Sequence, residues 1–408
     1  MATAFPKYTD DEEAKLLPKN EAYTSFPLEV DQVDQKYANI RSTSSGNKVF
    51  QNFSKLALAT VTLLIFVASY PYAIKFLSSS EPDSFFKKEG LPAGKPNFVF
   101  ILLDDVGWNA LGMNEYDVGF ATPYLNNLFS KGITIENYYS QEMCTPARSA
   151  LFTGRYPITI GMQYGAIGGK SETGLATSEI LVTEVLKSHG YINYGLGKWN
   201  LGHYKAQHLP TARGFDHYLG YMDSANYYWA KVNPTYKDYY DFMYADLNCY
   251  NVYDGDDRED YSTDLYTAKA MDAIEEHDFS SPIFLYMAYQ AAHEPFHDYE
   301  AYEDGLTADM VGTAQYDAVK SKVLGGERQQ FALTLVKLDT AVFQLYQALH
   351  AKGQAENTYF IIASDNGGCY GSGGKNGPLR GSKGSLFEGN LNYVYCVWCN
   401  LTVCLRWY

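Results

Sequence analysis

The chain has 408 residues, with 32 Lys and Arg against 47 Asp and Glu, which gives a formal net charge of −15 at pH 7. This acidic balance argues against a nucleic-acid-binding protein, which would carry a basic surplus or stripe. With 46% hydrophobic and 16% aromatic residues the chain can bury a sizeable core, so a wholly disordered protein is excluded, and the length suggests one large or two medium domains.

Three segments precede the first predicted strand. Residues 1–55 are polar, mixed in charge and without periodicity, which predicts a disordered tail. Residues 56–74 are apolar and uncharged, and roughly 20 such residues are enough to cross a bilayer core. We therefore predict one transmembrane helix over residues 56–76, with a buried core helix or a cleaved signal peptide as alternatives. A linker containing Pro, Gly and Ser follows over residues 77–96.

From residue 97 onward, short apolar runs alternate with helical patterns, which is typical of an α/β sheet protein. The predicted strands are residues 97–103, 133–139, 191–196, 283–289 and 359–364. The predicted helices are residues 123–132, 145–154, 178–188 and 327–352. Thr122 and Pro123 predict the cap and the first turn of the first helix.

Polar side chains follow four of these strands. The first strand runs into Asp104-Asp105 and the last into Asp365-Asn366, while Lys198 and His293 follow the third and fourth strands. Sites of open α/β sheets lie beyond the carboxyl ends of their strands. The sequence therefore predicts that these side chains meet at one edge of the sheet.

The acids and the amide among them form a set of oxygen ligands without thiolate or imidazole. Hard divalent cations such as Ca²⁺ and Mg²⁺ prefer this set, and a cation would offset the repulsion between carboxylates. A single Asp-Asp pair is more often a turn or a helix cap. Two acidic strand ends far apart in the sequence favour the metal site.

Cys144 stands at the predicted start of the helix over residues 145–154. Backbone N–H groups and the helix dipole favour an anion at this position, and Arg148 adds a cation within the first turn. Cys144 is therefore either an activated thiolate or a structural cysteine packed at a helix cap. These residues by themselves do not decide between the two.

The run CTPARSALFTG, residues 144–154, resembles the signature of the sulfatase family, C-x-P-x-R followed by x-x-L-x-T-G. Other blocks of that family occur in the family's order along the chain, one before this run and four after it. They are NFVFILLDDVGW from residue 97, GLGKWNLGHY from 195, HEP from 293, SDNGG from 364 and PLRGSKGSLFEG from 378. The resemblance covers about residues 96–389 and is strongest to the arylsulfatase B type.

The resemblance implies an alkaline-phosphatase-like α/β fold, with a mixed central sheet and helices on both faces. The catalytic domain would occupy residues 97–389. The family continues with more core and a small C-terminal subdomain, so we expect that subdomain to be missing and residues 390–408 to form an atypical tail.

The resemblance also implies hydrolysis of sulfate esters by a formylglycine made from Cys144. One Ca²⁺ would be bound by Asp104, Asp105, Asp365, Asn366 and the modified Cys144. Arg148 would steady the aldehyde hydrate, Lys198 and Lys383 would hold sulfate oxygens, and His293 would protonate the leaving oxygen. These residue types suit sulfuryl transfer, in which cations and a general acid stabilise the transition state.

The implied substrate is a sulfated small molecule or glycan. The implied partner is the formylglycine-generating enzyme of the endoplasmic reticulum. We therefore predict a single-pass membrane glycoprotein of the secretory pathway, anchored through residues 56–76 with its catalytic domain in the lumen or outside the cell. Residues 400–402 form a glycosylation sequon.

One position in the signature blocks departs from the family. Asn200 stands where the family has a histidine that would remove a proton from the aldehyde hydrate, and an amide cannot take a proton at physiological pH. We expect slowed turnover, unless His203 acts in its place.

Two alternative functions remain open. The first is a phosphodiester or phosphonate ester hydrolase of the same superfamily, which would share the metal site. The second is a catalytically silent, truncated sulfatase-like protein.

Overall fold

The computed structural model describes residues 94–112, 117–246, 250–255, 260–296 and 310–398. The predicted tail, membrane helix and most of the linker lie outside these residues, as does the sequon. No helix in the described ranges is long and apolar enough to cross a membrane.

Nine strands of the described residues form one sheet, in the order β2-β9-β8-β1-β7-β3-β4-β5-β6. The strands are β1 (Asn97–Leu103), β2 (Ile133–Tyr139), β3 (Ile192–Lys198), β4 (His217–Tyr221), β5 (Met243–Ala245), β6 (Tyr250–Val252), β7 (Ile283–Ala288), β8 (Thr358–Ser364) and β9 (Asn392–Trp398). The run from β8 to β4 is parallel, and the strands added at both edges are antiparallel. The predicted mixed α/β sheet is confirmed.

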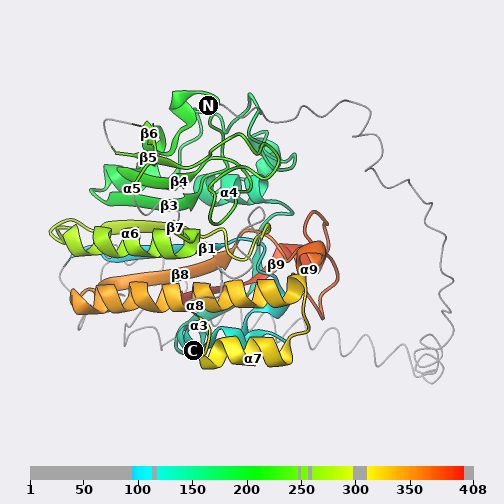
Figure 1. Cartoon of the computed structure of the whole chain (residues 1–408). Helices are drawn as coiled ribbons and strands as arrows, with labels where there is room; N and C mark the ends of the chain where they lie inside the picture. Colours follow the sequence, from blue (N-terminus) through cyan, green and yellow to red (C-terminus); the bar gives the residue numbers. More distant parts are fainter. Residues whose placement is uncertain (1–93, 113–116, 247–249, 256–259, 297–309, 399–408) are drawn as a thin grey trace, which may run out of the picture. The chain divides into compact units, whose positions relative to one another are not determined.

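Helices pack on both faces of the sheet. The helices are α3 (Pro123–Lys131), α4 (Cys144–Thr153), α5 (Val182–Ser188), α6 (Ser262–Glu276), α7 (Ala314–Lys322), α8 (Glu327–Ala351) and the single turn α9 (Glu388–Leu391). In Figure 1, α6 and α8 lie along one face of the sheet. Their apolar side chains join those of β1 and β7 in one core cluster, and a second cluster on α4 and β3–β4 includes Phe152, Trp199 and Phe215.

The central strands are buried because they are apolar throughout. Every residue of β7 is buried, as is expected for a parallel strand with helices on both sides. In β1 and β8 the first four residues alternate between buried and half-buried, and the last three are all buried. The carboxyl ends of these strands therefore place whatever follows them inside the molecule.

The structure differs from the prediction in the cap of α3 and in the first residue of α5. Thr122 makes no capping hydrogen bond to α3; instead, Asp339 of α8 accepts the N–H groups of Tyr124 and Leu125, at 3.0 and 2.7 Å. The helix predicted from residue 178 starts at Val182, since Glu184 Oε2 accepts the Leu181 N–H at 2.8 Å and so fixes the first turn there.

The segment expected to be an atypical tail belongs to the sheet. Strand β9 pairs antiparallel with both β8 and β2, so β2 is connected to the rest of the sheet through it. The family blocks end at α9, but the following residues, NYVYCVW, are rich in Tyr, Val and Trp, which suit a strand. The ordered domain therefore continues beyond residue 389.

Candidate active site

Two neighbouring strands deliver the acidic residues to one point. Strands β1 and β8 pair in parallel with Leu103 opposite Ser364, so the residues after them are also neighbours. The Asp105 N–H donates to Asp365 Oδ1 at 3.4 Å, and Asn366 Nδ2 donates to Asp105 Oδ1 at 2.5 Å. Together with Asp104, these side chains are at most 2% exposed.

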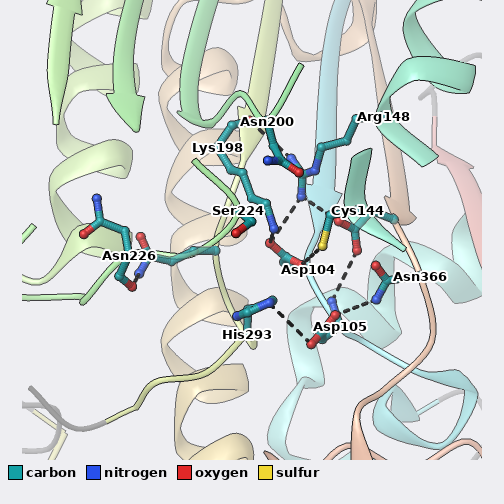
Figure 2. A network of polar contacts seen from close by, with 12 residues as sticks. Asp104, Asp105, Cys144, Arg148, Lys198, Asn200, Ser224, Asn226, His293 and Asn366 are labelled. Carbon is teal, nitrogen blue, oxygen red and sulfur yellow. Dashed lines mark hydrogen bonds and ion pairs between the residues drawn. The ribbon is translucent and has the colours of Figure 1, made fainter. Parts of the chain in front are cut away.

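Cys144 is the first residue of α4 and faces this acidic group (Figure 2). Its Sγ lies 3.7 Å from Asp104 Oδ1, and the residue is 1% exposed. Burial raises the pKa of Cys144 to about 12, against the opposing effect of Lys198 and Lys383. The unmodified side chain is therefore a neutral thiol, and the helix N-terminus does not produce the thiolate that the sequence allowed.

Arg148 joins α4 to both acidic strand ends. Its Nη2 lies 2.7 Å from Asp365 Oδ2 and 3.3 Å from Asp104 Oδ2, and all three side chains are fully buried. Burial by itself lowers the pKa of Arg148, but Asp365 and Asp104 raise it well above its usual value. The guanidinium is thus a permanent cation at the centre of the site.

Lys198, the last residue of β3, is equally buried. Its Nζ lies 2.6 Å from Asp104 Oδ2. Burial raises the pKa of Asp104, but Lys198, His293 and Arg148 outweigh this effect and hold it below its usual value. Gly197 precedes the lysine with φ of +104°, and a Cβ there would lie 1.9 Å from the Ala288 carbonyl oxygen. Only glycine lets β3 approach β7 this closely.

Lys383 and His293 form the other side of the site. Lys383 Nζ lies 2.7 Å from Asp105 Oδ1 and 2.8 Å from His293 Nε2. The imidazole Nδ1 contacts the Glu294 carbonyl oxygen, so Nε2 is the nitrogen that faces the acids. Burial lowers the pKa of Lys383, but the neighbouring carboxylates, above all Asp105, raise it well above its usual value.

The oxygen set fits a hard divalent cation. Carboxylate oxygens of Asp104 and Asp105 lie within 4.8 Å of each other, and Cys144 Sγ and a ring nitrogen of His293 lie within the same distance. Asn366 Oδ1 is buried and has no hydrogen-bond partner within the described ranges. A buried oxygen without a partner costs free energy, and a bound cation would supply the missing contact. In this structure the carboxylates form ion pairs with Arg148, Lys198 and Lys383. A bound cation would take over the contacts of the two lysines, whose ammonium groups could then bind an anionic ligand.

Asn200, the residue that departs from the family pattern, has a structural set of contacts. It has a left-handed φ of +52°, which Asn tolerates better than most residues. Thr145 Oγ1 donates to its Oδ1 at 2.7 Å, and its Nδ2 donates to the Ile167 carbonyl oxygen at 2.9 Å. The Ile167 N–H in turn donates to Thr145 Oγ1 at 2.9 Å. The amide thus fixes the residue next to Cys144.

His203 is not placed as a substitute for the missing histidine. Its Nε2 lies 3.0 Å from the Gly169 carbonyl oxygen, and no contact joins it to Cys144 or Arg148 within the described ranges.

The sequence did not predict the hydroxyl group that supports the site by hydrogen bonds to its backbone. The Tyr228 hydroxyl, fully buried, lies 3.0 Å from the Gln290 carbonyl oxygen and 2.9 Å from that of His293. It thereby positions the loop that carries His293. Tyr228 lies in a Tyr- and Asp-rich segment without a motif, so the sequence offers no signal that singles it out.

The fold and the site describe an α/β protein with a buried cluster of acidic and basic side chains at the carboxyl edge of its sheet. Residues 96–402 match the Sulfatase family, and the chain belongs to that family. It is 34% identical over 307 residues to mouse arylsulfatase J, covering 74% of this chain and 47% of the relative. It is 32% identical over 325 residues to mouse N-acetylgalactosamine-6-sulfatase, covering 74% and 57%. The chain thus spans about half the length of these curated relatives.

Solved structures agree with this assignment. The crystal structure of Ps i-CgsB in complex with k-i-k-neocarrahexaose superposes with a TM-score of 0.63 at 27% identity, covering 75% of this chain and 66% of that one. The PsFucS1 sulfatase from Pseudoalteromonas sp. superposes with a TM-score of 0.60 at 22% identity, covering 75% and 62%, and so shares the fold.

Proposed function

We propose that the chain hydrolyses sulfate esters of carbohydrates or aryl alcohols, using a formylglycine made from Cys144 and one bound Ca²⁺. One observation carries the proposal: Cys144 lies among three buried carboxylates and three cationic side chains drawn from three strand ends, one helix and one loop. Buried opposite charges at this density are characteristic of a reaction centre.

The residues of the site would have separate roles in the proposed reaction. Lys198 and Lys383 bind the sulfate oxygens and stabilise the charge that develops on them in the transition state. The Glu294 carbonyl can only accept from Nδ1–H of His293, so Nε2 is the nitrogen that would deliver a proton to the leaving oxygen, from a doubly protonated ring. Arg148 keeps Asp104 and Asp365 in place and steadies the group formed at position 144.

Two groups complete the site when present. Ca²⁺, held by Asp104, Asp105, Asp365 and Asn366, would neutralise the acids and polarise oxygen, and the hydrated formylglycine would supply a hydroxyl nucleophile. The oxygen-only donor set and the unpartnered Asn366 Oδ1 support the cation.

The experiment combines mass spectrometry with an activity assay. The full chain, expressed in a secretory host, is analysed for aldehyde at position 144 and for release of sulfate from 4-nitrocatechol sulfate. We expect aldehyde and turnover in the wild type, and neither in Cys144→Ala. Cys369→Ala is the control, because Cys369 is also a free cysteine. An unmodified thiol with no sulfate release would refute the proposal.

The same assay separates the two alternatives. Hydrolysis of bis(4-nitrophenyl) phosphate in place of the sulfate ester would indicate a phosphodiesterase. The silent alternative is favoured by Asn200, whose amide contacts Thr145 and Ile167 and provides no base. It predicts no hydrolysis of either ester.

The proposal includes anchoring by residues 56–76, with the catalytic domain in the lumen of the secretory pathway and the formylglycine-generating enzyme as a partner. The uncharged apolar sequence of residues 56–74 supports this placement. A protease-protection assay on microsomes tests it, and cleavage of the catalytic domain in intact microsomes would contradict it.

A further inference from the structure

A cavity opens at the N-terminal end of α8, outside the candidate active site. It has a volume of about 540 Å³ and is lined by Asn109, Arg328, Tyr370 and a glycine-rich loop that includes Lys375. None of these residues has a role in the proposed reaction.

The cavity lies at the same sheet edge as the reaction centre. Asn109 follows Asp105 along the chain and Tyr370 follows Asn366, each by about four residues, a stretch that spans at most about 14 Å. The glycine-rich loop that lines the cavity is also joined to Lys383, since the Gly368 carbonyl accepts the Lys383 N–H at 3.2 Å. The lining of the cavity therefore lies at a distance from the reaction centre that one or two sugar units span.

Ion pairs make the walls of the cavity rigid. Asp117 contacts Arg328 Nη2 at 2.5 Å and Lys375 Nζ at 2.6 Å, which joins two loops to the first turn of α8. Although partial burial raises the pKa of Asp117, hydrogen bonds from Arg328 and Lys375 lower it to about 2, so the carboxylate stays ionised at neutral pH. Arg328 Nη1 also donates to the Gly373 carbonyl at 2.7 Å.

The chemistry of the lining suits a sugar unit. The Tyr370 ring is 53% exposed and offers an apolar platform, and the Lys375 side chain is 50% exposed and offers a donor for hydroxyl or sulfate oxygens. Glu327 lies at the same cavity and can accept from hydroxyl groups. Gly373 has φ of +77°, and a Cβ there would lie 2.6 Å from the Glu327 carbonyl carbon, so the shape of the wall requires glycine.

The geometry points to a subsite in this cavity for a neighbouring sugar unit of a sulfated glycan, with Tyr370 and Lys375 as its specificity-determining contacts. The inference rests on the proposed function and narrows its substrate from any sulfate ester to an oligosaccharide. A simple aryl sulfate would occupy the reaction centre and leave this subsite empty.

The test compares a long and a short substrate in the full chain. Tyr370→Ala and Lys375→Ala are assayed with a sulfated galactosaminoglycan hexasaccharide and with 4-nitrocatechol sulfate. We expect kcat/KM for the hexasaccharide to fall about fivefold to tenfold, through KM, with less than about a twofold change for the aryl ester. The matched controls are Tyr156→Ala, a tyrosine 76% exposed, and Lys187→Ala, a lysine 41% exposed that pairs with Asp216 at 2.8 Å.

Binding of the same hexasaccharide to the Cys144→Ala chain, measured by calorimetry, separates the two proposals. If the wild type turns over both substrates and neither cavity substitution changes the kinetics, the subsite is refuted and the proposed function stands. If the wild type shows no turnover and the cavity substitutions weaken binding of the hexasaccharide, the subsite is supported and the proposed function is refuted. Absence of both turnover and binding would refute both.

Discussion

Arg148 Nη2 lies 2.7 Å from Asp365 Oδ2, and both side chains are fully buried. This contact joins the first turn of α4 to the end of β8, across more than half of the described chain. Because Arg148 also contacts Asp104, one guanidinium connects the helix that carries Cys144 to both acidic strand ends. The site and the stability of the fold therefore depend on the same residue.

Arg148→Ala is expected to destabilise the protein strongly. The substitution leaves Asp365 buried without its cation, and breaking a buried pair typically costs about 3–5 kcal/mol. Urea unfolding measures the loss. Arg155→Ala is the control, because Arg155 is 51% exposed and its pair with Glu179 should contribute no more than about 1 kcal/mol. Similar losses in both variants would contradict the argument.

Asn200→His is expected to speed the regeneration of the enzyme while weakening the fold. Histidine supplies a base, so steady-state sulfate release should rise relative to the first-turnover burst. The Thr145 hydroxyl and the Ile167 carbonyl would lose their amide partner, at a cost of about 1–3 kcal/mol. Asn200→Ala, which loses the amide without adding a base, is the control. An unchanged ratio of burst to steady state would disprove the kinetic part.

Calcium is expected to stabilise the purified protein. A ligand at about 100 times its Kd adds about 2.7 kcal/mol to the free energy of unfolding, which a thermal shift assay after EDTA treatment detects. Asp105→Ala should abolish the shift. Asp264→Asn should keep it, because Asp264 pairs with Lys337 outside the site. A wild type that unfolds at the same temperature with and without calcium would argue against the metal site.

Asp339 is expected to make stability depend on pH. Burial raises its pKa from 3.8 to about 7, against the hydrogen bonds from Leu125 and Tyr124. Between these two pH values the folded state binds a proton that the unfolded state does not. The contribution of Asp339 to the free energy of unfolding is therefore complete below pH 3.8 and is lost as the pH rises to about 7.

Asp339→Asn mimics the protonated acid, so the free energy of unfolding of this variant should fall less between pH 5 and pH 7.5 than that of the wild type. Urea unfolding at the two pH values measures the difference. Asp278→Asn is the control: a hydrogen bond from Ser280 lowers the pKa of this exposed carboxyl, so its titration lies below the tested window. An equal pH dependence in wild type and Asp339→Asn would contradict the assignment.

The central strands were predictable because burial on both faces requires a continuous apolar run. The predicted boundaries of β1 and β2 agree with the structure to the residue, and those of β7 and β8 to within one residue. Helices α6 and α7 and strands β4–β6 were missed. Strands β5 and β6 are three residues each, too short for periodicity, and α6 has only a weak apolar face because it packs partly through Ser262, Thr263 and Thr267.

The sequence also predicted which residues meet. Asp104, Asp105, Asp365 and Asn366 lie together because β1 and β8 are parallel neighbours, and Lys198, His293 and Lys383 join them. The charge state of Cys144 was not predictable. A helix N-terminus favours the thiolate, but the surrounding burial favours the thiol, and burial depends on the packing of distant segments.

By itself the sequence determined the apolar strands, the order of the polar residues at their ends and the family to which the chain belongs, because these depend on local composition and spacing. Only the tertiary structure decided that Asp339 caps α3, that Asn200 supports Thr145 and that β9 joins β2 to the sheet. Each of these is a hydrogen bond between segments distant in sequence, and its formation depends on how the whole core packs rather than on the residues beside it.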